Sequence, residues 1–249
     1  MDNVNESEAR LAIVSGGSRG LGAALCEAWQ QLGWQVLELS RSAPHAYSRR
    51  LDLADPAAAA EGLRAALQPL AEQRWDEIVI VNNAALLTPI GPVADQARGE
   101  LIAHLTVNVT GGVLLMAEAV QQFQASAARK TLVNISSGAA LKAYAGWALY
   151  GASKAALEHC VRSLAVEQAA QAHPLVAINV DPGVMDTGMQ AAIRASNADD
   201  FPDHARFVER HRAGELRPPA VVAGAIVRLV ASNAFEGGGR YSVAEWLTA

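Results

Sequence analysis

A phenol, an ammonium group and a hydroxyl occur at a spacing that could serve a single carbonyl group. Tyr150 and Lys154 stand four positions apart in the run Tyr-Gly-Ala-Ser-Lys, and Ser137 lies thirteen residues upstream of the tyrosine. The apolar pattern of residues 148–171 predicts a helix, on which positions i and i+4 share one face. A nearby cation lowers the pKa of an acidic group by about 1–3 units, from about 10 for an isolated tyrosine. These residues therefore predict a site that donates a proton to a carbonyl oxygen.

The composition limits the kinds of protein that could carry this site. The chain has 249 residues, of which 51% are hydrophobic and 18% charged, and this favours one globular α/β domain. A formal net charge of −5 argues against nucleic-acid partners and anionic membranes. The pair Cys26 and Cys160 falls in apolar helical patterns, which indicates reduced core thiols rather than disulfides or a metal cluster. Without an apolar signal segment at residues 1–8, which resemble a loose tail, we expect a cytoplasmic, metal-free protein with no membrane span.

Strand and helix patterns alternate along the chain. Strands are predicted at residues 11–15, 34–39, 78–81, 131–135 and 175–180, with short segments ending near 51–53 and near 241. Helices are predicted at residues 21–32, after Asp55-Pro56, within 94–124, at 148–171 and from 219 to 231. This alternation predicts a single-domain Rossmann fold, in which a doubly wound parallel sheet carries helices on both faces. Ligands of such sheets bind at the carboxyl ends of the strands.

A glycine-rich turn joins the first predicted strand to the first helix. In the run Gly-Gly-Ser-Arg-Gly-Leu-Gly, glycines 16, 20 and 22 could let the backbone approach a diphosphate at the helix N-terminus. An ordinary tight turn is the alternative. The second strand ends at Ser40-Arg41, where a cation favours the 2′-phosphate of NADP and a carboxylate would favour NAD. With Arg19 inside the turn, two guanidinium groups could bind one phosphate, so we expect NADPH rather than NADH.

Further motifs occur in a fixed order and together resemble the short-chain dehydrogenase/reductase family over nearly the whole chain. The motifs are Ser15 to Gly22, Asp52, Asn82-Asn-Ala-Ala85, Asn108, Ser137, Tyr150-x3-Lys154 and Pro182 to Thr187. Two positions depart from the usual family pattern, Ser15 in place of threonine and Ala85 in place of glycine. Both replacements are small, and we expect cofactor binding to survive them.

The resemblance implies a role for each motif residue. Tyr150 would donate the proton, Lys154 would lower its pKa and hold the nicotinamide ribose, Ser137 would bind the substrate carbonyl, and Asn108 would hold a relay water. The expected NADP(H) contacts are Gly16, Ser18, Arg19, Gly20, Leu21, Gly22, Arg41, Asp52, Leu53, Asn83, Ala84, Tyr150, Lys154, Pro182, Gly183, Met185 and Thr187. Simpler interpretations stay open for three of them: turn capping for Asp52, a helix kink for Asn108 and a helix cap for Thr187.

A narrower resemblance links the segments around residues 133–137, 146–150 and 181–190 to sepiapterin reductases and bacterial benzil reductases, whose substrates carry adjacent carbonyl groups. Sepiapterin reductases anchor the pterin with a carboxylate near the C-terminus, where this chain has Ser242. Pterin reduction is therefore the less favoured activity. The expected substrate pocket is apolar and includes Leu141, Tyr144, Trp147 and Met189, with Phe201 and Phe207 nearby.

These expectations combine into one functional hypothesis with two rivals. We expect an NADPH-dependent carbonyl reductase for small aromatic or vicinal dicarbonyl compounds, with residues 188–217 as a mobile lid. The rival enzyme is a 3-oxoacyl thioester or hydroxysteroid reductase of the same family. The rival from another class is an NADPH-sensing regulatory protein, which would need no proton donor. The family resemblance also implies a homodimer or homotetramer, formed through the helices at 94–124 and 148–171.

Overall fold

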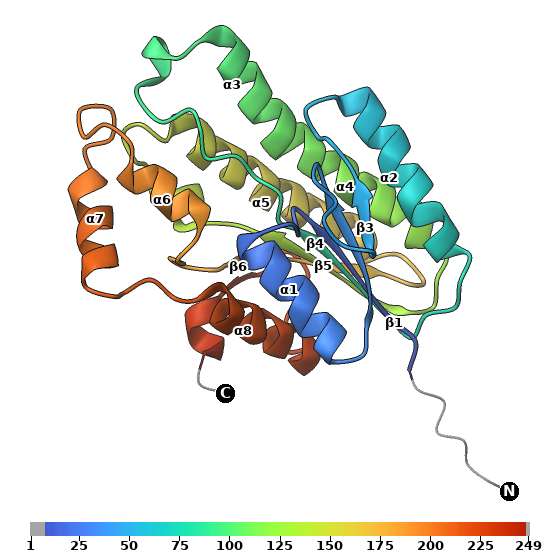
Figure 1. The fold of residues 1–249 in the computed structure, drawn as a ribbon. Helices are drawn as coiled ribbons and strands as arrows, with labels where there is room; N and C mark the ends of the chain where they lie inside the picture. The colour runs from blue at the N-terminus through green and yellow to red at the C-terminus, as the bar shows by residue number, and fades with distance from the viewer. Residues whose placement is uncertain (1–7, 248–249) are drawn as a thin grey trace, which may run out of the picture.

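One parallel sheet organises the computed structural model, which describes residues 8–247. Its seven strands follow the order β3-β2-β1-β4-β5-β6-β7 (Figure 1). The strands are β1 (Arg10–Ser15), β2 (Gln35–Ser40), β3 (Ser48–Arg50), β4 (Glu77–Asn82), β5 (Arg129–Ile135), β6 (Leu175–Asp181) and β7 (Arg240–Ser242). The strand order reverses direction between β1 and β4, so this point on the carboxyl edge is the expected place for a ligand. The predicted doubly wound α/β fold is confirmed.

Helices cover both faces of the sheet, as the alternating pattern predicted (Figure 1). The α-helices are α1 (Gly20–Gln31), α2 (Pro56–Ala71), α3 (Arg98–Leu105), α4 (Gly111–Phe123), α5 (Ala148–Gln168), α6 (Gly188–Arg194), α7 (His204–Arg212) and α8 (Pro219–Ser232). Short turns of 3-10 helix lie at Val93–Asp95, Gly138–Ala140 and Val243–Trp246. Helices α1 and α8 pack together on one face, and α2, α4 and α5 cover the other.

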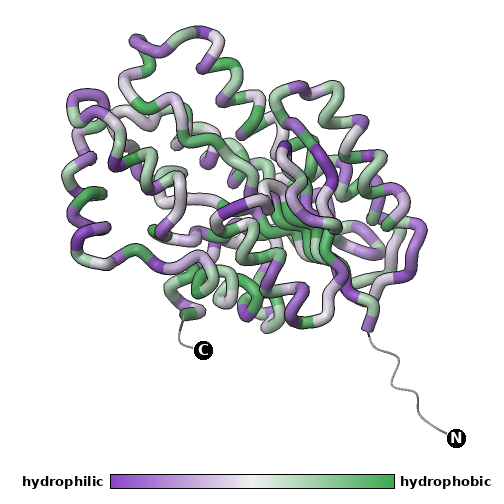
Figure 2. Tube along the Cα trace, viewed as in Figure 1, coloured by the Kyte–Doolittle hydropathy of each residue, from purple (hydrophilic) through white to green (hydrophobic). Residues whose placement is uncertain are grey.

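The core consists of two apolar layers, one on each side of the sheet. Every residue of β4 is buried, and β1 is buried after its first residue, because helices cover both faces of these central strands. Figure 2 shows the hydrophobic strands gathered at the centre, with hydrophilic positions toward the periphery. Leu63 and Leu67 of α2 are fully buried at helical spacing, and the Asp55 side chain accepts hydrogen bonds from Ala57 N and Ala58 N as the predicted cap.

Two regions are more regular or more complex than the sequence indicated. Residues 188–217 contain the two helices α6 and α7, and the helical region at 94–124 is interrupted by a π-helix at Thr106–Thr110. By length and composition, Arg98–Phe123 is apolar enough to cross a membrane. Core helices pass the same test, and buried residues such as Leu115 and Phe123 join the layer between the sheet and α2. We therefore interpret this run as a layer of the fold.

The remaining expectations on the chain's chemistry concern thiols, metals and the tail. Cys26 is buried, Cys160 is partly buried, and both are free thiols. Within residues 8–247, no group of three or more His, Cys, Asp or Glu side chains is arranged to hold a metal ion. The loose tail predicted for residues 1–8 lies outside the described residues except for Glu8, which is exposed.

Candidate active site

Helix α5 brings Tyr150 beside Ser137, which follows β5. Gly151 makes this approach possible, because a Cβ atom there would lie 2.9 Å from the carbonyl oxygen of Ala139. The Ser137 Oγ accepts a hydrogen bond from Ala139 N at 3.1 Å, which leaves its own proton free to be donated. The neighbouring Ser136 points away and donates to Glu158, so Ser137 is the serine on the tyrosine side, as predicted.

The pKa of Tyr150 differs from the sequence-based prediction. We expected Lys154 to lower it, but burial raises the pKa of Tyr150 to about 12. The Ser137 side chain opposes this rise, whereas the negative charge of Asp181 adds to it. Lys154 Nζ lies 5.8 Å from the centroid of the phenol ring and donates to Ile135 O at 2.7 Å. The predicted lowering by Lys154 is therefore not found in this structure, where loss of water is the largest influence on the pKa of Tyr150.

Lys154 itself is a buried cation. Lys154 is only 4% exposed, and burial lowers the pKa of its ammonium group to about 8. The hydrogen bond to Ile135 O, at the end of β5, fixes the ammonium group at the carboxyl edge of the sheet. A lysine in this position can act both as a hydrogen-bond donor to a ligand and as a titratable group near neutral pH.

Asn108 is held by the backbone of the segment that follows β4. Its Oδ1 accepts from Leu86 N, its Nδ2 donates to Leu86 O, both at 2.7 Å, and Nδ2 also lies 3.0 Å from His104 Nε2. Both amide hydrogens are thereby used. His104 is fully buried with its Nδ1 2.8 Å from Thr88 O, and burial lowers the pKa of His104. Any relay water at Asn108 would need its backbone carbonyl or the remaining Oδ1 lone pair.

The glycine turn is packed against the end of β4. A Cβ atom at Gly16 would lie 2.8 Å from Ala84 Cα, and one at Gly22 would lie 2.3 Å from Gly16 O. Asn83 Nδ2 donates to the carbonyls of Ser15 and Gly16, and the Ser15 hydroxyl accepts from Asn83 N and Ala84 N. Ser15 thus links the end of β1 to the segment after β4, and Asn83 and Ala84 lie beside the glycine turn.

The turn and helix α1 fit the diphosphate of a dinucleotide. The Arg19 side chain does not cap α1, so the amide groups of the first turn are available to an anion. Gly20 has φ +57°, a conformation that favours glycine. Ser18 is partly buried in this turn, while Leu21 packs into the core and can meet a ligand only through its backbone.

Arg19 and Arg41 are the two cations expected at the adenosine end. Both side chains are exposed, and neither forms an ion pair within residues 8–247. Asp52 is exposed and accepts from Ala54 N at 3.0 Å, so it caps a turn and keeps one carboxylate oxygen free. The Leu53 side chain packs in the core against Gly111, which leaves only its backbone for the predicted cofactor contact.

The loop that follows β6 also lies at the carboxyl edge of the sheet. Pro182 is buried, and Gly183 has φ +69° with its N–H donating to Asp181 Oδ1 at 3.0 Å. Met185 is partly buried and pairs with Arg217 in an isolated bridge. Thr187 is the N-cap residue of α6 without a side-chain cap bond, and its methyl group would lie 3.6 Å from a Cβ at Gly20. The loop and the glycine turn are therefore neighbours.

An aromatic cluster borders Tyr150. Trp147 stacks on Phe201 with ring centroids 4.6 Å apart and meets Tyr150 edge-on at 5.7 Å. Tyr144 and Phe207 complete the set of rings. Met189 packs against the cluster, as do Leu87 and Ile193, which the sequence analysis did not identify. Leu141 is 72% exposed and lies outside the cluster, so the structure gives no support to its predicted place in the pocket.

Three asparagines on β4, β5 and β6 form a buried ladder of side-chain hydrogen bonds. Sequence reasoning did not find this ladder. Asn82 Nδ2 donates to Asn134 Oδ1 at 3.0 Å, and Asn134 Nδ2 donates to Asn179 Oδ1 at 2.8 Å. The three residues are register partners on β4, β5 and β6. Each asparagine stands within the last three residues of an apolar strand, and this shared position was the available signal.

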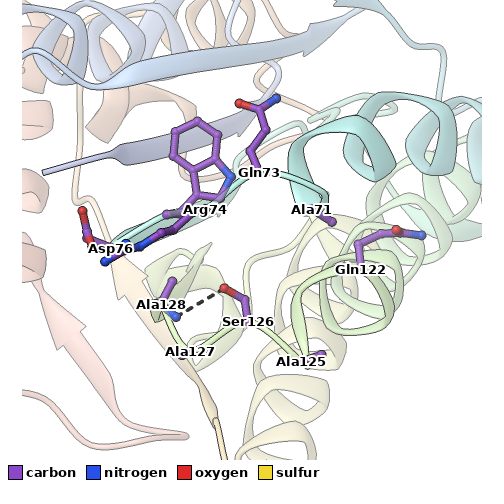
Figure 3. A pocket seen from close by; sticks show the side chains of 10 residues that line it. Ala71, Gln73, Arg74, Asp76, Gln122, Ala125, Ser126, Ala127 and Ala128 are labelled. Carbon is purple, nitrogen blue, oxygen red and sulfur yellow. Dashed lines mark hydrogen bonds between the residues drawn. The ribbon is translucent and has the colours of Figure 1, made fainter.

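A separate cavity of about 630 Å³ lies at the amino ends of β4 and β5 (Figure 3). Gln73, Arg74 and Asp76 border it from one side, and Ser126 and Ala128 from the other, where Ser126 Oγ accepts from Ala128 N. Tyr150 and the glycine turn lie at the carboxyl ends of the strands. The cavity therefore belongs to the edge opposite the candidate active site.

The fold and this site define a class of protein. Residues 10–198 match the family model of short chain dehydrogenases, and the chain belongs to that family. It is 35% identical to a benzil reductase ((S)-benzoin forming) of Bacillus subtilis over 242 residues, which cover 95% of this chain and 99% of the relative. The expected family and its benzil and sepiapterin reductase branch are thereby confirmed.

Two further proteins extend the comparison. A sepiapterin reductase of Bos taurus is 32% identical over 166 residues, which cover 65% of this chain and 60% of the relative. A crystal structure of a putative NAD(P) dependent gluconate 5-dehydrogenase from Beutenbergia cavernae, with bound NADP at low occupancy, is 27% identical with a TM-score of 0.77. That match covers 97% of this chain and 98% of the solved chain. The chain is thus similar to reductases along almost its whole length.

Proposed function

We propose that this protein is an NADPH-dependent reductase of small aromatic or vicinal dicarbonyl compounds. The observation that carries the proposal is the position of Tyr150, whose phenol meets Ser137 on one side and the edge of Trp147 on another. A proton donor bordered by aromatic rings suits a carbonyl flanked by aromatic groups. Similarity to a benzil reductase supports the same substrate class.

The cofactor preference follows from charge at the adenosine end. Arg19 and Arg41 are exposed cations beside the glycine turn, and β2 ends without a carboxylate that would bind a ribose 2′-hydroxyl. Two guanidinium groups favour the dianionic 2′-phosphate of NADPH. The turn and α1 hold the diphosphate, Lys154 lies within the edge that meets the ribose, and Thr187 lies beside the turn.

The chain's own residues then handle the proton. NADPH, when bound, supplies the hydride that reduces the carbonyl carbon. Ser137 donates a hydrogen bond to the carbonyl oxygen and increases the positive character of that carbon. Tyr150 keeps its proton at neutral pH, because burial raises the pKa of its phenol to about 12. It donates this proton to the oxygen as alkoxide character develops, since an alkoxide is a stronger base than a phenolate.

Entry of the substrate requires motion of the lid. Tyr150 is 7% exposed, and Phe201 and Phe207 of residues 188–217 pack against Trp147, whose ring meets the phenol edge-on. Helices α6 and α7 pack against each other at one side of the molecule, where they can move without disturbing the sheet (Figure 1). We infer that this segment opens to admit the diketone and excludes water when it closes.

We further propose a cytoplasmic homodimer or homotetramer that has no nucleic-acid or membrane partner. The helical faces expected at the interface expose large apolar side chains, among them Ile102 on α3, Val113 on α4 and Val166 on α5. Light scattering coupled to size exclusion measures the assembly directly. A monomer at micromolar concentration would contradict this part of the proposal.

A substrate panel tests the proposed function. Steady-state rates are measured with benzil-like diketones, sepiapterin and acetoacetyl thioesters, each with NADPH and with NADH. The proposal predicts the highest kcat/KM for a diketone with NADPH. Preference for the thioester would end the dicarbonyl assignment, and cofactor binding without turnover of any carbonyl would favour a regulatory role.

A further inference from the structure

A charged cluster contacts the backbone of Ser137. Arg240 of β7 donates from Nε to Glu158 Oε1 at 2.8 Å and from Nη2 to Asp181 Oδ2 at 2.9 Å. The same Nη2 donates to the backbone carbonyl of Ser137 at 3.1 Å. One guanidinium group thus connects α5, β6 and the segment after β5.

The cluster is mostly removed from water. The Glu158 side chain is 2% exposed, that of Asp181 20% and that of Arg240 25%. Glu158 also accepts from the Ser136 hydroxyl, and its other oxygen lies 3.7 Å from Arg162. Two carboxylates that share a buried region repel each other unless a cation separates them. Arg240 supplies that charge, and its planar fork holds both partners in a fixed geometry.

We propose that Arg240 is a positioning residue for the carbonyl reduction, which it serves by fixing the Ser137 backbone and the Asp181 carboxylate beside Tyr150. The inference rests on the proposed function. Arg240 touches neither phenol nor substrate, so its effect passes through Ser137 and Asp181. Because the Ser137 hydroxyl must point at the carbonyl oxygen, a small shift of its backbone misaligns the donor that polarises the substrate.

The cluster also sets the charge that Tyr150 experiences. Lys154 of α5 lies 5.8 Å from the centroid of the phenol ring, and His104 of α3 feels the charge of Lys154. Arg240 of β7 connects Asp181 of β6, whose charge acts on the phenol, to Glu158 of α5. The carboxylate of Asp181 raises the pKa of Tyr150. Removal of Arg240 leaves that carboxylate without its ion-pair partner, so the phenol should hold its proton more tightly. Alcohol oxidation requires the phenolate, so its rise with pH should move to higher pH.

The test compares variants that share the loss of an arginine on Glu158. Arg240→Met removes all the contacts to Ser137 and Asp181, whereas Arg162→Met removes only the outer cation, which is half exposed. We expect Arg240→Met to lower kcat for benzil by about 10- to 100-fold with little change in KM, and to shift the pH profile of alcohol oxidation upward. Arg162→Met should keep both the rate and the profile of the unchanged enzyme.

A third variant separates charge from geometry and guards against misfolding. Arg240→Lys keeps a cation between the carboxylates but cannot make all three hydrogen bonds. It should restore most of the pH profile and little of kcat. If Arg240→Met does not fold, the inference is tested by whether the kcat of Arg240→Lys is lower than the kcat of Arg162→Met. Unchanged kcat and an unchanged pH profile in the folded Arg240 variant would overturn the inference.

Tyr150→Phe, assayed in parallel, distinguishes the two levels of the argument. If it is inactive while the Arg240 variants match the unchanged enzyme, only the positioning role fails. If Tyr150→Phe retains full activity, the proposed function fails, whatever the Arg240 variants show.

Discussion

Lys154 should weaken the folded protein at neutral pH, and Lys154→Met should relieve that cost while it abolishes activity. The ammonium group is buried, and the pKa of Lys154 falls from 10.5 to about 8 in the folded protein. Each pKa unit corresponds to about 1.4 kcal/mol, so the buried charge costs about 3 kcal/mol at pH 7. Methionine has a similar length but no charge. Loss of the hydrogen bond to Ile135 O offsets about 1–2 kcal/mol of the gain.

The pH dependence gives the sharper result. Below pH 8 the folded and unfolded states both carry the Lys154 proton, and the full cost is present. Between pH 8 and 10.5 the unfolded state binds more protons than the folded state, so the free energy of unfolding contributed by this group rises with pH. At pH 9.5 about 1 kcal/mol of the cost remains. The advantage of Lys154→Met should therefore shrink by about 2 kcal/mol between pH 7 and 9.5.

Urea unfolding at several pH values measures this difference, because titrations common to both proteins cancel. The upper limit of pH 9.5 avoids ionisation of Tyr150, whose pKa is about 12. Lys142→Met, at an exposed lysine, is the matched control and should show no such pH-dependent difference. Parallel curves for Lys154→Met and the unchanged protein would show that burial does not penalise Lys154.

Three further predictions concern the cofactor and the lid. Arg41→Ala should raise KM for NADPH about 10-fold or more and leave KM for NADH nearly unchanged, and equal changes would exclude a 2′-phosphate contact. Gly22→Ala should lose dinucleotide affinity, measured by cofactor fluorescence, because its Cβ would overlap Gly16 O, whereas Gly99→Ala, with open space around its Cβ, should bind normally. Amide hydrogens of residues 188–217 should exchange more slowly with NADPH and a diketone analogue bound, and exchange that ligands do not alter would argue against a lid.

The sequence was sufficient for those features that depend on local pattern and strand ends. Tyr150 and Lys154 share a helix, and the glycine turn follows a buried strand, so their meeting at one edge follows from parallel sheet topology. The Asp55 cap was predictable from local pattern alone, because its hydrogen-bond partners lie two and three residues away.

Features that depend on distant packing were not predictable. The pKa of Tyr150 rises because the phenol is buried in a cluster that includes Leu87 and Phe201, residues far from it in the sequence, and spacing alone carries no measure of that burial. Arg240 stands 82 residues from Glu158, in a strand of only three residues. The exposure of Leu141 likewise depends on how the turn after Ser137 packs, which apolar character alone does not specify.

The central claim is that Tyr150 gives its proton to a ketone oxygen. The most direct test measures NADPH oxidation with saturating benzil for the unchanged enzyme and for Tyr150→Phe, with NADPH affinity determined separately by fluorescence. The account predicts a loss in kcat of about 100-fold or more with NADPH affinity nearly unchanged, since a general acid contributes that much to such a step. Turnover of benzil by Tyr150→Phe at the original rate would contradict it.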